Sequence, residues 1–382
     1  MCPLSRRSAL LLGGISVSTA LNGCSALSQI GSKQIDWTTT VGDDDIFSPP
    51  AVGDELVYVG VSESDIVALD SDSGEVEWRR FGNGLMAVPV LSNGRLVSRT
   101  RWGDLLCLDA VSGAVEWEQS IPSDSGVIPP PATDDETVYI ATSKDVRALS
   151  VTDGEVRWRQ PFARGQSTEG DGILATGRPA LSDGVLYLKA GPPCGDFSAL
   201  DAESGEVLWT AKTDTQETTY SMRYSPGVGS RHVFVGTEGG TLHAFDRETG
   251  DETFTIKTEG PTTSPTLAED RLLFGSGPAS AESTLHAVDP TDGSDKWSVS
   301  VYGTQWYANP TVSDGTVYVG HWADTDSEKP PRVVGFNVRT GTEMGSVSVE
   351  RNVSAKLTVE NGHVYVPAGN RLTAINVTSF QD

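Results

Sequence analysis

Short runs of apolar residues alternate with polar turns along almost the whole chain, and two phrases of this pattern recur. The first starts with Pro and holds two apolar stretches separated by a polar turn, as in Pro50–Gly60 (PAVGDELVYVG) and Pro310–Gly320 (PTVSDGTVYVG). The second has eleven residues, as in Ala68–Trp78 (ALDSDSGEVEW), with a Gly near its middle. Each phrase predicts two strands joined by a tight turn. Four strands in a repeat of about 40–50 residues are typical of one blade of a β-propeller.

The second phrase occurs eight times. Its Asp, or the residue that replaces it, stands at positions 70, 109, 150, 201, 246, 289, 337 and 376. The last copy ends before its fourth strand, whereas residues 34–37 (QIDW) have the sequence of such a strand. We therefore predict an all-β, eight-bladed propeller of four-stranded blades over residues 35–382, closed by the N-terminal strand, which completes the last blade. A seven-bladed ring is the alternative, but it would leave one copy without a place.

The fourth strand of most repeats carries a large aromatic residue at one position. We predict that each ring packs against the next blade, beside the small residue of its own phrase, and that these side chains serve the architecture: Trp37, Trp78, Trp117, Trp158, Trp209, Phe254 and Trp297. The seventh copy has Gly345 at this position. The Gly near the middle of the phrase is expected to form a turn with a positive φ.

The first residues have the pattern of an export signal. Arg6 and Arg7 precede an apolar stretch over residues 9–20. This stretch is too short to span a bilayer, which needs about 20 helical residues. Paired arginines before such a stretch indicate a twin-arginine signal.

Residues 21–24 (LNGC) resemble a lipobox, in which the Cys becomes the lipidated first residue of the mature protein. We predict a signal peptide over 1–23 and a lipid-anchored tether over 24–34. Cys24 would hold the exported protein at the extracellular face of the cell membrane. The alternative is a cleaved signal in which Cys24 is incidental, and Asn22 is uncommon in a lipobox.

Charge narrows the range of partners. The chain of 382 residues has 52 acidic and 28 basic side chains and a net charge of −24. Such a surface repels a phosphate backbone, which excludes nucleic acid as a partner. The aromatic residues are too many for a disordered chain. Many acids with few lysines resemble the proteins of salt-loving archaea and predict a halophilic protein; the alternative is an acidic protein of a mesophile.

The pattern Ala-x-Asp-x-x-x-Gly-x-x-x-Trp, as in Ala68–Trp78 and Ala199–Trp209, resembles the PQQ-like repeat of the quinoprotein propellers over about residues 35–382. One branch of that family comprises alcohol and sugar dehydrogenases, which bind pyrroloquinoline quinone and calcium through acidic and amide side chains in the central funnel. The BamB-like branch is non-catalytic and includes the lipoprotein subunit of the outer-membrane barrel-assembly machine. The chain is similar to the second branch in its size, its lipobox and its short blade loops.

The resemblance and the export signal together imply an exported, membrane-anchored propeller that binds or scaffolds a protein or a small ligand at the cell surface, rather than an enzyme. A calcium-assisted alcohol or sugar dehydrogenase that uses pyrroloquinoline quinone is the alternative. The barrel-assembly role is not carried over, because an archaeal cell has no such outer membrane. We expect a monomer. We also expect no catalytic residues and no metal site, since the motifs of metal-dependent and nucleophilic hydrolases are missing from the sequence.

Candidate ligand-binding residues lie in the crossovers from each outer strand to the next inner strand, which line the funnel mouth of a propeller. Those that depart from the repeat combine aromatic, cationic and amide side chains: Arg178, Arg223, Tyr224, Trp306, Tyr307, Asn309 and Lys356. Such a lining suits a sugar, a quinone or an acidic peptide. The alternative interpretation is that these side chains plug the channel and pair with nearby acids.

Overall fold

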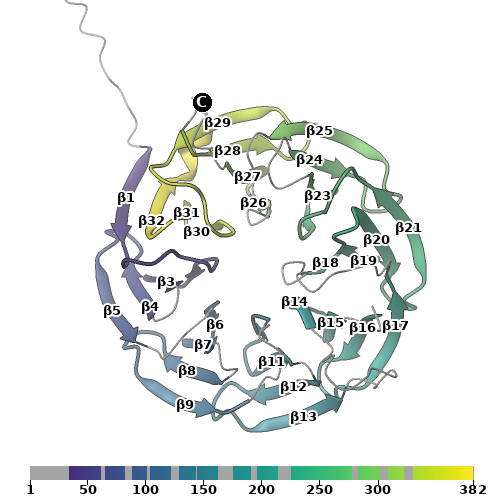
Figure 1. Cartoon of the computed structure of the whole chain (residues 1–382), viewed down its shortest axis with the longest axis horizontal. Helices are drawn as coiled ribbons and strands as arrows, with labels where there is room; N and C mark the ends of the chain where they lie inside the picture. Colours follow the sequence, from purple (N-terminus) through teal and green to yellow (C-terminus); the bar gives the residue numbers. More distant parts are fainter. Residues whose placement is uncertain are drawn as a thin grey trace, which may run out of the picture. The chain divides into compact units, whose positions relative to one another are not determined.

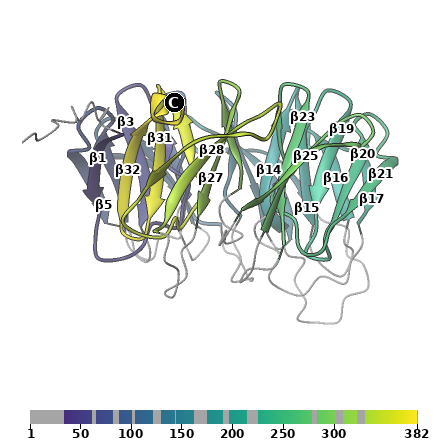
Figure 2. The ribbon, with the colours of Figure 1, turned by 90° about the horizontal axis from the view of Figure 1, so that it is seen from above.

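The computed structural model describes residues 34–381 apart from the internal segments 62–64, 82–87, 101–103, 122–128, 143, 162–174, 191–195, 214–224, 278–282, 302–308 and 322–329. Within the described residues the strands form eight antiparallel sheets of four strands each, arranged as blades around a ring (Figure 1). Seen from the side, the strands run between the two faces of the ring (Figure 2). The structure confirms the eight-bladed β-propeller predicted from the repeat.

Each of the first seven blades consists of four consecutive strands, from the inner to the outer edge. Blades 1–3 are β2 (Ala51–Val52), β3 (Leu56–Val61), β4 (Asp65–Asp70) and β5 (Val76–Phe81); β6 (Val90–Ser92), β7 (Arg95–Arg99), β8 (Leu105–Asp109) and β9 (Val115–Gln119); and β10 (Ala132–Thr133), β11 (Thr137–Ala141), β12 (Asp145–Ser150) and β13 (Val156–Pro161). Blades 4 and 5 are β14 (Ala175–Ser182), β15 (Val185–Ala190), β16 (Asp196–Asp201) and β17 (Val207–Lys212); and β18 (Gly227–Val228), β19 (His232–Gly236), β20 (Thr241–Asp246) and β21 (Glu252–Lys257). Blades 6 and 7 are β22 (Thr266–Ala268), β23 (Arg271–Ser276), β24 (Ser283–Val288) and β25 (Asp295–Val301); and β26 (Thr311–Ser313), β27 (Thr316–His321), β28 (Arg332–Asn337) and β29 (Glu343–Ser348).

The eighth blade joins the two ends of the propeller. Its inner strands are β30 (Thr358–Glu360), β31 (His363–Ala368) and β32 (Arg371–Asn376), and its outer strand is β1 (Ile35–Thr40). β1 runs antiparallel to β32, with Thr38 opposite Thr373. The hydroxyl oxygens of these two threonines lie 3.1 Å apart. The N-terminal strand therefore closes the ring, as predicted, and covers what would be an exposed sheet edge.

One contact is repeated at the interfaces between blades. The Trp of the outer strand lies opposite the small residue of the neighbouring strand, as Trp158 lies opposite Ala148. Its indole N–H donates to a backbone carbonyl of the next blade, and Trp158 Nε1 lies 2.9 Å from the oxygen of Ala202. Further Trp side chains make the equivalent bond over 2.8–3.1 Å: Trp37, Trp78, Trp117, Trp209 and Trp297.

The Gly of the phrase makes room for the indole of the preceding blade. Gly205 has a φ of +76°, a conformation that L side chains rarely adopt. An added Cβ at this position would also lie 2.5 Å from Cε3 of Trp158. The repeat therefore combines Gly and Trp because the two residues meet across each blade interface.

In the fifth blade Phe254 replaces the Trp, and a His makes the hydrogen bond that Phe cannot make. His232 Nδ1 lies 3.0 Å from the carbonyl oxygen of Pro290, which is the equivalent acceptor in the next blade. A carbonyl oxygen only accepts, so Nδ1 carries the proton. The imidazole meets the Phe254 ring edge-on, with the centroids 5.6 Å apart. Together, His232 and Phe254 of the fifth blade thus supply the hydrogen bond and the aromatic ring that one Trp supplies in other blades.

The seventh blade has Gly345 at the aromatic position, and an aromatic side chain from the C-terminal end occupies the space. The 3-10 helix η1 (Val377–Phe380) follows β32 and buries Phe380 completely. An added Cβ at Gly345 would lie 3.0 Å from the Cα of Phe380. The Phe380 ring meets Tyr318 edge-on, with the centroids 5.0 Å apart. The irregular seventh copy is thus completed by a residue outside the repeat.

Candidate functional site

The inner strands of all eight blades surround a central pocket of about 930 Å³. In every repeat, the residue directly before the Pro of the first phrase lines this pocket; in the last repeat Leu357 stands in place of that Pro. A residue that precedes Pro is restricted to an extended backbone, so the repeat presents one side chain per blade. We call these eight residues the channel ring: Pro49, Val88, Pro130, Arg178, Ser225, Ser264, Asn309 and Lys356.

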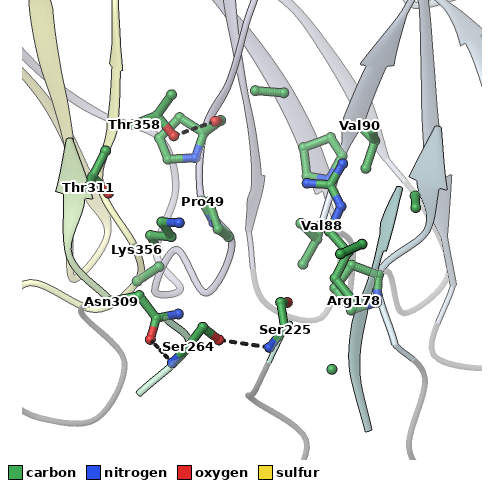
Figure 3. A pocket seen from close by; sticks show the side chains of 18 of the residues that line it. Pro49, Val88, Val90, Arg178, Ser225, Ser264, Asn309, Thr311, Lys356 and Thr358 are labelled. Carbon is green, nitrogen blue, oxygen red and sulfur yellow. Dashed lines mark hydrogen bonds between the residues drawn. The ribbon is translucent and has the colours of Figure 1, made fainter. Parts of the chain in front are cut away.

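The channel ring is divided into two unlike arcs. Blades 1–3 contribute the apolar residues Pro49, Val88 and Pro130, and blades 5–7 contribute the polar residues Ser225, Ser264 and Asn309. Arg178 in blade 4 and Lys356 in blade 8 stand at the two boundaries. Because three blades lie between them on either side of the ring, they lie on opposite sides of the pocket (Figure 3).

Hydrogen bonds connect the members of the polar arc. The backbone N–H of Ser225 donates to Oγ of Ser264 over 2.7 Å, and the N–H of Ser264 donates to Oδ1 of Asn309 over 3.1 Å (Figure 3). This second bond fixes the orientation of the Asn309 amide, because a backbone N–H can only donate. The Nδ2 group of Asn309 is thus the donor of this amide that remains.

The two cations of the channel ring are held in an unfavourable environment. Arg178 is exposed to the channel and Lys356 is half-buried. Desolvation lowers the pKa of Lys356, and the positive charge of Arg178 lowers it further. Desolvation also lowers the pKa of Arg178. Within the described part of the chain, neither side chain forms an ion pair or a hydrogen bond with the protein.

The comparison with protein families agrees with this architecture. A family model described as "Outer membrane protein assembly factor BamB" matches residues 62–223, 193–277 and 281–379. The chain belongs to this family. Its membership confirms the PQQ-like, BamB-type repeat predicted from the sequence pattern.

Individual relatives share the BamB name and the fold. The BamB of Yersinia pestis is 25% identical over 291 residues, which cover 69% of this chain and 68% of the relative. A solved BamB structure from Moraxella catarrhalis has a TM-score of 0.69 and 19% identity, covering 90% of this chain and 99% of that chain. A quinohemoprotein alcohol dehydrogenase from Comamonas testosteroni also has a TM-score of 0.69, with 14% identity over 89% of this chain and 76% of the enzyme. At these identities the solved structures show the shared fold alone.

In this BamB-family chain, three of the ligand-binding residues predicted from the sequence line the pocket together: Arg178, Asn309 and Lys356. The other predicted residues lie outside the described residues: Arg223, Tyr224, Trp306 and Tyr307. The same holds for Arg6, Arg7 and Cys24 of the predicted export signal. Five members of the channel ring were missed, namely Pro49, Val88, Pro130, Ser225 and Ser264. Their common signal was available, since each directly precedes the Pro of a repeat.

The described wall of the channel does not fit a calcium-bound quinone. Calcium takes six to eight oxygen ligands, many of them carboxylates. Among the described residues that line the pocket none is Asp or Glu, and Oδ1 of Asn309 already accepts a bond from Ser264. The described segments also contain no group of three or more His, Cys, Asp or Glu that could hold a metal ion. We derive no chemical step through that cofactor.

Proposed function

We propose that this chain is an exported, membrane-anchored propeller that binds a protein partner at the cell surface. Relatives are named outer membrane protein assembly factors, and we carry over only a general role in binding proteins. The observation that supports it is Phe47, which is 62% exposed and lies beside the central pocket. Large aromatic side chains are enriched among the residues that contribute most to protein interfaces.

Phe47 is held in place although it is exposed. The N–H of Ile46 donates to the carbonyl of Gly369 over 2.8 Å, and the carbonyl of Ile46 accepts from Oγ of Ser354 over 2.7 Å. On the other side, Oγ of Ser48 accepts from the N–H of Gly60 over 2.9 Å. Both flanking residues are buried. Binding of a partner to Phe47 therefore costs little conformational entropy, because the crossover that carries Phe47 is already ordered.

Photo-crosslinking tests the proposed surface. A photoreactive phenylalanine analogue at position 47 should give one adduct of defined mass in intact cells. The same analogue at Val111, which is 75% exposed in the turn between β8 and β9, is the control, because antiparallel pairing places that turn at the opposite face. Phe47→Ala should reduce recovery of the identified partner at least tenfold. Equal adducts at both positions would contradict a binding surface at the channel mouth.

The anchor is tested separately. From the lipobox-like residues 21–24, we expect Cys24→Ala to release the protein into the medium or to leave its signal uncleaved. Membrane attachment unchanged by the substitution would refute the anchor and leave the binding proposal intact. Among the described residues no helix is long and apolar enough to cross a membrane. Saturable one-to-one calorimetric binding of pyrroloquinoline quinone with calcium would instead favour the oxidoreductase.

A further inference from the structure

Among the described residues, the two cations of the channel ring lack the carboxylate partner that many of the arginines have. Many of the described arginines outside the channel pair with carboxylates; Arg79 is 3.0 Å from Asp65, and Arg247 is 2.7 Å from Asp183. The chain has 52 acidic side chains, but none of those described lines the pocket with Arg178 and Lys356. Desolvating a charge without a partner is costly. The protein thus maintains two cations in a position that disfavours them.

We propose that the channel binds an organic carboxylate, with its carboxyl group held by Arg178 and Lys356. The cations come from opposite sides of the pocket, so an anion between them is attracted by both. Its negative charge would relieve the repulsion that lowers the pKa of Lys356. Charge-assisted hydrogen bonds from a guanidinium and an ammonium group to one carboxylate are among the stronger polar contacts in proteins.

The polar arc supplies a further donor and no competing charge. Oδ1 of Asn309 is used by Ser264, which leaves the Nδ2 group of Asn309 to donate to a ligand. Asn309 lies in blade 7, next to Lys356 in blade 8. At this boundary the described channel-ring residues thus offer an ammonium group and an amide N–H, both of which favour an anion over a cation.

The apolar arc indicates that the anion has an apolar body. Pro49, Val88 and Pro130 form a continuous arc over blades 1–3, from one cation to the other. An inorganic anion would leave this arc in contact with water, whereas an aromatic or aliphatic group would cover it and gain about 25 cal/mol for each Å² of apolar surface buried. The pocket volume of about 930 Å³ is in the range of small-molecule sites. This inference does not depend on the proposed protein partner.

Calorimetric titration of the full-length protein at one fixed NaCl concentration tests the proposal. Benzoate is the probe, benzamide is its neutral counterpart, and acetate lacks the apolar body. We expect benzoate to bind at least tenfold more tightly than either. Arg178→Met and Lys356→Met should each weaken benzoate at least tenfold and leave benzamide unchanged, while Val88→Ser should weaken benzoate but not acetate. Arg339→Met removes an equal charge from a surface residue, 69% exposed and paired with Glu269, and should change nothing.

Three results would overturn the proposal. Equal affinity for benzoate and benzamide would show that charge is not recognised. Unchanged benzoate binding in Lys356→Met would place the ligand elsewhere. Displacement of benzoate by phosphate or chloride at equal concentration would identify a general anion site without preference for a carboxylate. Misfolding is distinguished from loss of the site, because Lys356→Met removes an unfavourable charge and should melt at or above the temperature of the wild type.

Discussion

Adding one methyl group at Gly205 tests how the blades are joined. In Gly205→Ala the new Cβ must adopt a φ of +76° and lies 2.5 Å from Cε3 of Trp158. The positive φ should lower the free energy of unfolding by about 1–2 kcal/mol. The contact with the indole should lower it by about 1–3 kcal/mol more. Gly184→Ala is the matched control, because Gly184 has a φ of +73° in the same blade and an added Cβ there would meet nothing within 4 Å.

Removing the indole separates the two costs. Trp158→Ala alone should lower the free energy of unfolding by about 3–5 kcal/mol, which includes the bond from Nε1 to the carbonyl of Ala202. In the double variant Trp158→Ala/Gly205→Ala the steric contact is absent, so Gly205→Ala adds only the cost of the positive φ to the cost of losing the indole. The loss of unfolding free energy in the double variant should therefore be smaller than the sum of the two single losses by about 1–3 kcal/mol.

Urea denaturation followed by far-UV circular dichroism measures these differences, provided that the slopes agree among the variants. The double-mutant cycle must be measured at one salt concentration, since the acidic surface makes stability depend on ionic strength. Additivity within about 0.5 kcal/mol would refute the reasoning. So would an equal loss in Gly205→Ala and Gly184→Ala, because the indole would then contribute nothing to the requirement for Gly.

Three further outcomes are expected. Phe380→Ala should lower the free energy of unfolding by about 3–5 kcal/mol in the same assay, as for other fully buried Phe residues; a loss below about 1 kcal/mol would show that η1 does not hold blade 7. The unfolded chain binds more protons than the folded one between the lowered pKa of Lys356 and the ordinary value for lysine, so stability should rise with pH through that interval. Lys356→Met should thus raise the melting temperature at neutral pH and lose this advantage in strong alkali, whereas a drop at neutral pH would contradict the assigned environment. Arg6→Lys with Arg7→Lys should retain the protein in the cytoplasm by cell fractionation, and normal export would exclude a twin-arginine signal.

Most of the architecture could be predicted because the information is local. Each of the first six eleven-residue phrases contains its turn Gly, its small residue and its aromatic residue, so the blades and the closing strand at Ile35–Thr40 could be predicted. Phe380 could not be predicted, because it lies outside the phrase and reaches Gly345 only in three dimensions. The hydrogen bond of His232 could not be predicted either, because its acceptor Pro290 belongs to another blade.

The site could be predicted only in part, because most of its residues are distinguished by a repeated position before Pro and not by an unusual side chain. Three of its residues were predicted because their cationic or amide side chains depart from the repeat: Arg178, Asn309 and Lys356. Ser225 and Ser264 are ordinary residues whose importance comes from their place before Pro226 and Pro265. The division of the channel ring into arcs follows from blade order, which no single stretch of sequence displays.

Closure by β1 also sets the timing of folding. Thr38 and its partner Thr373 are separated by 335 positions, so the first strand leaves the ribosome long before the strand it pairs with. At about 5–20 residues per second, β1 waits for tens of seconds. During that interval its hydrogen-bonding edge is open, and a chain cut short at any codon before β32 never covers it. β1 therefore becomes part of a sheet only when the last blade has been made.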